Sequence, residues 1–386
     1  MNQESNYLES AAKCTRCGNC QYFCPTYNAS RVESFTARGR LQLVRSQAGQ
    51  PDAAFSDTFV KRMNQCLLCG NCSSICPSGI QTEAIIEAVR ADCVRANGPS
   101  TPLGLTRDNI ARAGSITGDA PANRLLWFKN IEDKLAGMKI NERAEYAYLT
   151  GCVPALYPSS YSIPQSFVLL LRQAGIDFTL VGDTENCCGY PLLIGGLPAE
   201  ARAAAERNVA NLARLGVRKI ITTCPSCYHM WHDLYPELLG RPLDLQIIHG
   251  TQLLASLLQD GRLALKETKR VVTFHDPCDL GRKSGEYDAP RAVLQSIPGV
   301  QYREMKHARE DSRCCGGGGN MEMNDAALGG KVAQDRVRQA LETGADTIVT
   351  ACQQCKRTLM GGARQMKARI KVMDISEILS EAVSQS

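Results

Sequence analysis

Cysteine is the residue type that could do most of the chemistry in this chain. The 386 residues include 19 cysteines, and 18 of them fall into closely spaced groups that leave only Cys93 outside. Two groups of four lie near the N-terminus, and two groups of five follow. Corresponding members of the groups of five lie 126 to 128 residues apart, which indicates an internal duplication. In a reducing compartment such spacings are typical of metal ligands rather than of disulfides.

The groups of four form two runs with the same spacing. Residues 14–25 read CTRCGNCQYFCP and residues 66–77 read CLLCGNCSSICP. Each fits the C-x2-C-x2-C-x3-C-P run in which three thiols bind one cubane [4Fe–4S] cluster and the fourth binds the other cluster. The sequence therefore predicts one cluster on Cys14, Cys17, Cys20 and Cys76, and a second on Cys66, Cys69, Cys72 and Cys24. The alternative is a pair of zinc sites, but a zinc site takes four ligands and does not need two runs of the same spacing that exchange their fourth cysteine.

The groups of five need a different explanation. The first five-thiol group comprises Cys152, Cys187, Cys188, Cys224 and Cys227, and the second five-thiol group comprises Cys278, Cys314, Cys315, Cys352 and Cys355. Five thiols exceed the four that a tetrahedral zinc ion takes. Adjacent cysteines grip one small ion poorly, but they can bridge or hold different irons of an opened cluster. A structural zinc on four of the five thiols, in one or both copies, is the alternative.

Strands and helices alternate from residue 144 onward, and the strands lead into the cysteines. We expect strands at 144–150, 178–181, 219–223, 270–274, 301–305 and 347–350, and helices at 162–174, 198–215, from 289, and at 323–342. This alternation predicts α/β units with largely parallel sheets. Ligands gather beyond the carboxyl ends of such strands, which is where the cysteines of both five-thiol groups fall.

Helical patterns at 37–48, 57–64 and 82–96 predict that the N-terminal part is a mainly helical two-cluster module. Asn97 to Pro102 breaks the pattern and marks a boundary. The predicted fold is an α+β multidomain chain: a helical ferredoxin-like two-cluster domain over 1–98, a linker over 99–143, and tandem α/β cysteine-rich domains over 144–262 and 263–386. In the linker, the apolar residues 125–128 are expected to pack on a neighbouring domain, and the segment suggests no chemistry.

The motif of one cysteine, then Cys-Cys-Gly, then C-x2-C, present twice behind a two-cluster module, resembles the cysteine-rich (CCG) domain proteins. These include the catalytic subunit of heterodisulfide reductase and the iron–sulfur subunits of FAD-linked 2-hydroxyacid dehydrogenases such as glycolate oxidase. In the reductase branch, the resemblance implies, each five-thiol group holds a non-cubane [4Fe–4S] cluster and the two cooperate in splitting a disulfide. Both copies keep an intact final C-x2-C, which favours that branch. In this family such a subunit often works with a separate flavoprotein dehydrogenase, which favours the branch of the 2-hydroxyacid dehydrogenase subunits.

Three histidines could add proton transfer. His275 precedes Asp276-Pro277-Cys278 at a strand end, where it is the candidate catalytic acid beside the second five-thiol group; a structural role capping the loop is the alternative. His229 and His232 follow Cys227 on a helix and are read as a partly exposed polar face. Cys93 is read as a lone buried thiol.

Charge and missing motifs limit the functions. The formal charge of +5 counts cysteines as neutral, and thiolate ligands would offset it, so no nucleic-acid partner is expected. Arg364, Lys367, Arg369 and Lys371 form a basic run that is either a solvated helix end or a docking site for an acidic partner.

No strand is followed by G-x-G-x-x-G and no P-loop occurs, so we expect no flavin or nicotinamide on this chain. Met1 to Ala12 lacks the apolar core of a signal peptide, which favours the cytoplasm or the inner face of the membrane.

The leading hypothesis is an iron–sulfur electron-transfer subunit that is active only with its partners. It would pass electrons between a flavoprotein, either an FAD-linked dehydrogenase of the glycolate or lactate type or an electron-transfer flavoprotein, and a quinone or disulfide acceptor. A membrane or quinone-reducing partner fits the same hypothesis. The first alternative is a self-sufficient thiol–disulfide reductase working at two non-cubane clusters. The second is a metal-stabilised interaction scaffold without turnover.

Overall fold

The structure is a computed structural model that describes residues 3–47 and 55–384. Ala48, the last residue of one predicted helix, lies outside the described residues, as do the two residues at each end of the chain. Among the described residues, no helix combines the length and the apolar character needed to cross a bilayer.

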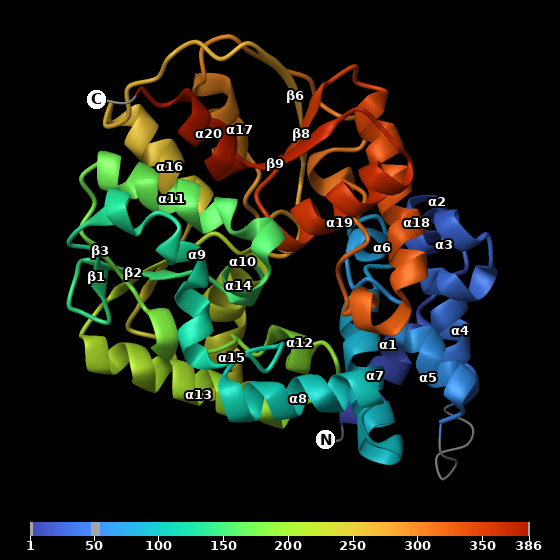
Figure 1. The fold of residues 1–386 in the computed structure, drawn as a ribbon. Helices are drawn as coiled ribbons and strands as arrows, with labels where there is room; N and C mark the ends of the chain where they lie inside the picture. Colours follow the sequence, from blue (N-terminus) through green and yellow to red (C-terminus); the bar gives the residue numbers. More distant parts are fainter. Residues whose placement is uncertain (1–2, 48–54, 385–386) are drawn as a thin grey trace.

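The N-terminal module is built from helices, as predicted, and forms one side of the molecule (Figure 1, blue). Its helices are α1 (Gln3–Ala12), α2 (Asn19–Phe23), α3 (Pro25–Ser30), α4 (Ala37–Gln47), α5 (Asp57–Asn64), α6 (Asn71–Ser74) and α7 (Thr82–Asn97), with a 3₁₀ turn at Glu33–Phe35. The short helices α2 and α6 each begin after a glycine with positive φ, Gly18 and Gly70, inside the cysteine runs. The lone thiol Cys93 is buried on α7, which confirms its expected burial.

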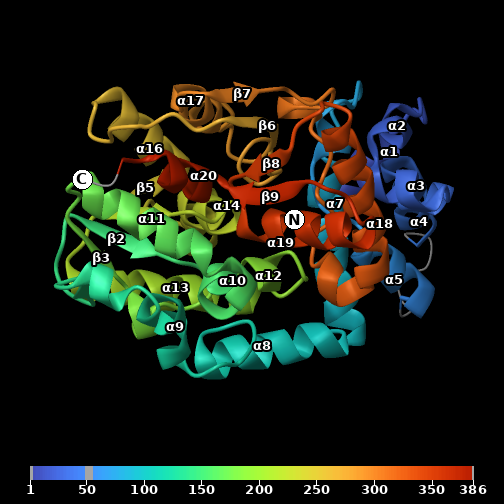
Figure 2. The ribbon, with the colours of Figure 1, turned by 45° about the horizontal axis from the view of Figure 1, so that its top comes forward.

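The segment predicted as a linker is folded onto its neighbours. It contains α8 (Thr101–Ala113), a 3₁₀ turn (Pro121–Leu125), α9 (Leu126–Lys129), a second 3₁₀ turn (Glu132–Leu135) and strand β1 (Lys139–Ile140). Figure 2 shows α8 running along one side of the molecule, between the N-terminal helices and α9. Trp127 and Phe128 are buried in the main core and Leu125 packs against it, which confirms the expected packing for these three residues, whereas Leu126 is exposed.

The first repeat is a parallel five-stranded sheet in the order β1-β3-β2-β4-β5. Its own strands are β2 (Tyr146–Leu149), β3 (Phe178–Leu180), β4 (Lys219–Thr222) and β5 (Gln246–His249). Its helices are α10 (Cys152–Leu156), α11 (Ser162–Gln173), α12 (Tyr190–Leu193), α13 (Pro198–Leu215), α14 (Pro225–His229), α15 (Tyr235–Leu239) and α16 (Gly250–Gln259), with 3₁₀ turns at Pro158–Ser160 and Gly182–Thr184 and a π-helical turn at Met230–Leu234. The linker thus supplies the edge strand β1, which pairs with β3.

The second repeat is a parallel four-stranded sheet in the order β7-β6-β8-β9, which is the order of the matching strands in the first repeat. Its elements are β6 (Arg270–His275), α17 (Asp288–Ser296), β7 (Val300–Tyr302), a 3₁₀ turn (Arg309–Asp311), α18 (Met321–Leu341), β8 (Thr347–Thr350), α19 (Gln353–Gln365), β9 (Lys371–Asp374) and α20 (Ile375–Ala382). The predicted strands and helices of both repeats are present, with ends shifted by a few residues.

One apolar core runs through both repeats. Tyr148 and Phe167 of the first repeat and Phe274 and Val349 of the second belong to the same buried cluster. Across the boundary, α11 packs against α20 and α16 packs against α17. Removal of this apolar surface from water holds the repeats together, so the cysteine-bearing loops of both are kept in a constant relation.

Candidate metal centres

The two N-terminal cysteine runs line two neighbouring cavities. The first cavity is bordered by Cys14, Cys17, Cys20, Cys72 and Cys76. The second cavity is bordered by Cys24, Cys66, Cys69 and Cys72. Each cavity therefore collects cysteines of one run together with a cysteine that the ligand-exchange pattern assigns to it from the other run. The assignment of individual ligands stays a prediction.

Of these eight cysteines, Cys69 is buried, Cys17 is exposed and the other six are partly buried. Burial raises the pKa of Cys20, Cys24 and Cys72, so their thiolates need a compensating cation. Convergent soft sulfur donors of this kind fit iron–sulfur clusters.

The first five-thiol group gathers at the carboxyl ends of β2 and β4. Cys152 begins α10, Cys224 precedes α14, and the thiols of Cys188 and Cys227 lie 3.5 Å apart. Hydrogen bonds from the thiols of Cys187 and Cys227 lower the pKa of Cys188 to about 6. All five thiols are linked by contacts of this kind, because Cys152 also contacts Cys187 and Cys224 contacts Cys227.

A buried arginine from the linker segment completes this group. Arg124 donates from Nη2 to Cys152 Sγ at 3.2 Å and to the Gly114 carbonyl at 2.9 Å, and its Nη1 lies 3.3 Å from Glu185 Oε1. Burial acts to lower the pKa of Arg124, but the Cys152 thiolate and the Glu185 carboxylate outweigh it and raise that pKa. Sequence reasoning missed Arg124, and the only signal for it was the apolar cluster at 125–128 that anchors the segment.

The second five-thiol group occupies the matching positions after β6 and β8. Cys352 caps α19 and accepts from the Cys355 backbone N–H at 3.4 Å. The Cys314 thiol contacts both Cys278 and Cys315, and the Cys315 thiol contacts Cys355.

Cys314 also contacts Cys69 of the N-terminal module. A hydrogen bond from the Cys314 thiol is the main cause that lowers the pKa of Cys69 to about 6. Arg282 fastens the same junction by donating to the Cys69 carbonyl at 2.6 Å and to the Ser312 carbonyl at 2.5 Å. The second N-terminal cavity therefore adjoins the second five-thiol group. The sequence held no sign of this contact, since 244 residues separate the two thiols.

His275 lies where the sequence predicted, at the end of β6. A ring nitrogen of His275 and the thiols of Cys315 and Cys355 lie within 4.8 Å of one another. Its Nδ1 accepts from Arg336 Nε at 3.0 Å, which leaves the ring proton on Nε2. Burial lowers the pKa of His275, so the ring is neutral. Its role as an acid stays a prediction, and so does the zinc alternative, since three such donors also begin a zinc site.

His229 and His232 lie beside Asp233 rather than among the thiols. Their Nδ1 atoms lie 2.7 and 2.6 Å from the Asp233 carboxylate oxygens. His232 is exposed and His229 is half-buried, as expected for a polar helix face.

The two five-thiol groups face each other across the boundary between the repeats. The Asp279 carboxylate, next to Cys278, accepts from Tyr190 Oη at 3.0 Å and from Ser226 Oγ at 2.7 Å, and Lys283 lies 3.2 Å away. Tyr190 begins α12, two residues after Cys188, and Ser226 lies in α14, two residues after Cys224. A second hydrogen bond across the boundary runs from Gln353 Nε2 to Thr223 Oγ1 at 2.9 Å. One carboxylate and one amide thus hold the cysteine-bearing loops of both groups together.

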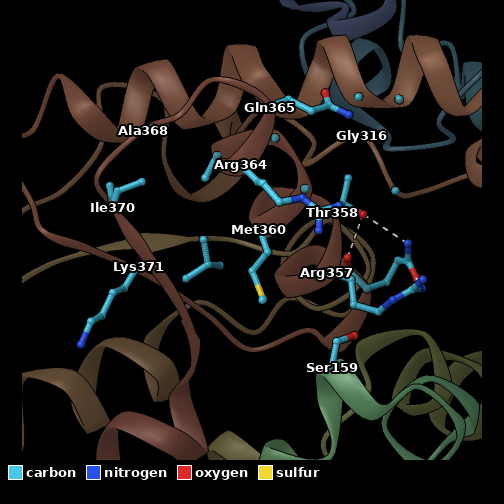
Figure 3. A pocket seen from close by; sticks show the side chains of 18 of the residues that line it. Ser159, Gly316, Arg357, Thr358, Met360, Arg364, Gln365, Ala368, Ile370 and Lys371 are labelled. Carbon is cyan, nitrogen blue, oxygen red and sulfur yellow. Dashed lines mark hydrogen bonds between the residues drawn. The ribbon is translucent and has the colours of Figure 1, made fainter.

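A surface groove of about 820 Å³ lies on the second repeat between α18, α19 and β9 (Figure 3). Gly316 and Gly317, which directly follow Cys315, form part of its wall. The basic run at Arg364, Lys367, Arg369 and Lys371 is exposed, and none of the four forms an ion pair with another described residue. The solvated-end interpretation is consistent with this exposure, and docking to an acidic partner stays a prediction.

Known proteins share both halves of this architecture. A family model described as "Cysteine-rich domain" matches residues 146–231 and 272–360, and one described as "4Fe-4S dicluster domain" matches residues 10–80. One subunit of the dihydromethanophenazine:CoB--CoM heterodisulfide reductase from Methanosarcina barkeri is 34% identical, over 97% of this chain and 94% of that protein. The EtfAB:quinone oxidoreductase of Syntrophomonas wolfei is 28% identical, over 96% of this chain and 58% of that protein.

A crystal structure of a hypothetical protein from Helicobacter pylori shares the fold, with a TM-score of 0.61, 12% identity, and coverage of 100% of this chain and 73% of that one. The sequence matches support iron–sulfur clusters, an oxidoreductase role and partner subunits in general. The chain belongs to the family of iron–sulfur oxidoreductase subunits that join a 4Fe–4S dicluster domain to paired cysteine-rich (CCG) domains, the family that includes the heterodisulfide reductase subunit from Methanosarcina.

Proposed function

We propose that this chain is the electron-transfer subunit of a multi-subunit oxidoreductase, passing electrons between a flavoprotein dehydrogenase or electron-transfer flavoprotein and a quinone or disulfide acceptor. The observation that carries the proposal is the continuity of thiol sites. The second N-terminal cavity adjoins the second five-thiol group through Cys69 and Cys314, and that group faces the first one.

We assign the ligands from the spacing of the cysteine groups. Cubane clusters would take Cys14, Cys17, Cys20 and Cys76, and Cys66, Cys69, Cys72 and Cys24; the five-thiol groups would hold one non-cubane cluster each. Bound iron–sulfur clusters supply one-electron transfer, which no side chain here provides. The protein excludes water by burying thiols of both five-thiol groups. The hydrogen bonds of Asp279 and Gln353 hold the two groups in a fixed arrangement. Cys17 is exposed, so we expect an external electron partner to approach the first cavity.

Anaerobic purification with iron and sulfide analysis tests the proposal first. Four four-iron clusters predict about sixteen irons per chain. Cys69→Ser should then slow the reduction of the five-thiol centres by reduced N-terminal clusters at least tenfold, measured by rapid-freeze paramagnetic resonance. Cys93→Ser removes a buried thiol from the same module outside both cavities and is the matched control. Equal rates in both variants would contradict the proposed route, and a colourless wild-type sample would refute the function itself.

A thiol–disulfide reductase is the second candidate, favoured by the intact final C-x2-C of both copies and by the facing five-thiol groups. The purified chain would then reduce an unsymmetrical disulfide with reduced viologen as the only electron source. Turnover that appears only after a flavoprotein is added would exclude a self-sufficient reductase.

A further inference from the structure

Arg124 is the feature of the first five-thiol group that the proposed function does not yet use. Its side chain is 1% exposed, and the Glu185 side chain beside it is 6% exposed. Glu185 in turn accepts from the backbone N–H groups of Thr150 and Gly151 at 3.0 and 2.7 Å. The guanidinium is therefore clamped in one position directly beside Cys152, with Nη2 against the sulfur.

One donor of this clamped guanidinium is left over. Nη1 and Nη2 are used by Glu185, Gly114 and Cys152, whereas the buried Nε has no hydrogen-bond partner among the described residues. Buried donors without partners are rare, and they suggest an acceptor that the polypeptide does not supply. An inorganic sulfide beside Cys152 is an acceptor of that kind, and hydrogen bonds to cluster sulfurs tune reduction potentials.

The second five-thiol group has no counterpart of this contact. Among the described residues, no arginine or lysine side chain donates to one of its sulfurs: Arg282 binds backbone carbonyls and Arg336 binds His275. Arg124 also comes from outside the duplicated part of the chain, so the duplication cannot have provided a matching residue.

We propose that Arg124 is a positioning residue of the first five-thiol centre: it fixes Cys152 and, by holding a positive charge against that sulfur, raises the reduction potential of this centre alone. The inference rests on the proposed function, because it requires a reducible centre at the first five-thiol group. A cation beside the centre stabilises its more negative, reduced form, so removing the cation makes reduction harder.

The test is a redox titration of the metal-loaded full chain, followed by paramagnetic resonance. The first-centre signal is identified as the one lost in the Cys187→Ser/Cys188→Ser variant. In Arg124→Met its midpoint potential should fall by at least about 59 mV, a tenfold change in a one-electron equilibrium. Arg124→Lys, which keeps the charge, should restore most of the loss. Glu185→Gln leaves the arginine charge uncompensated and should shift the midpoint upward.

Arg291→Met is the matched control, because Arg291 is a similarly buried arginine whose carboxylate partners, Asp276 and Glu304, lie in the second repeat. An equal shift in Arg124→Met and Arg291→Met would overturn the inference. If Arg124→Met fails to bind iron, the other two variants still decide. The midpoint should stay near the wild-type value in Arg124→Lys and rise in Glu185→Gln, and an unmoved midpoint in Glu185→Gln overturns the inference. A wild-type chain without a reducible first centre would instead refute the proposed function.

Discussion

The two repeats have the same strand order and the same cysteine positions, yet the surroundings of their thiols differ. The first five-thiol group receives Arg124 from the linker, whereas the second contacts Cys69 of the N-terminal module and has the neutral His275 at its edge. The residues that distinguish the groups come mainly from outside the duplicated elements. Duplication therefore reproduced the scaffold and the donors, and the added segments made the two copies different.

The largest expected effect comes from the residue after the first cysteine of each group, which is Val153 in the first repeat and Asp279 in the second. Asp279→Val makes the second loop like the first, but it leaves Lys283, whose side chain is only 12% exposed, without its carboxylate and removes the acceptor of Tyr190 and Ser226. Breaking a buried pair costs about 3–5 kcal/mol of unfolding free energy. Urea denaturation measures this cost, and Asp288→Ala, which breaks an exposed pair with Arg309, should cost less than about 1 kcal/mol. Similar losses in both variants would show that the ion pair and hydrogen bonds of Asp279 contribute little to stability.

A smaller difference is expected at the glycines of the two Cys-Cys-Gly motifs. Gly189 and Gly316 both have positive φ, at 85° and 94°. An added Cβ would meet the Ala204 side chain at 3.2 Å in the first repeat, but it would overlap the Gly329 backbone carbonyl in the second. Gly189→Ala should therefore cost about 1–3 kcal/mol, the usual strain of that backbone region, and Gly316→Ala should cost more. Thermal unfolding of the two variants measures the order, and the reverse order would contradict the packing difference.

The last effect concerns pH. His249 and Asp374 cap the matching helices α16 and α20, and both are buried. Burial lowers the pKa of His249 to about 3 from 6.5, so the unfolded chain binds the extra proton and stability falls as pH drops below about 6.5. Burial raises the pKa of Asp374 to about 7 from 3.8, so the folded chain binds the extra proton and stability falls as pH rises from about 4 to 7.

Single substitutions separate these opposing contributions. His249→Asn should reduce the loss of stability in acid, and Asp374→Asn should reduce the loss toward neutral pH, with both caps kept by the amide. The measurement is the free energy of unfolding at several pH values between 4 and 7.5. Parallel curves for the two variants would contradict the opposite titration of the caps.

The sequence predicted the parts of this structure that depend on local patterns. Strand–helix alternation located β2, β4, β6 and β8 and the cysteines at their ends, because hydrophobic periodicity and a turn after each strand are local properties. The doubled register of the N-terminal runs likewise predicted that cysteines of both runs meet in each cavity.

The parts that depend on distant contacts could not be predicted in this way. Arg124, the contact between Cys69 and Cys314, and the Asp279 tie each join segments brought together only by tertiary packing. A polar segment interrupted by glycines, such as 99–143, has no periodicity to indicate that it supplies both a strand and a charge to a neighbouring sheet.

The wall of the second N-terminal cavity has a consequence for biosynthesis. Gly318 approaches Leu67 so closely that an added Cβ would lie 2.7 Å from its carbonyl oxygen, and Arg90 donates to the Gly319 carbonyl at 3.2 Å. During translation the cysteines of the second run leave the ribosome long before these residues exist. Until residues 318 and 319 have been made, this part of the wall is missing, so the cavity cannot be complete while only the N-terminal module has been synthesised.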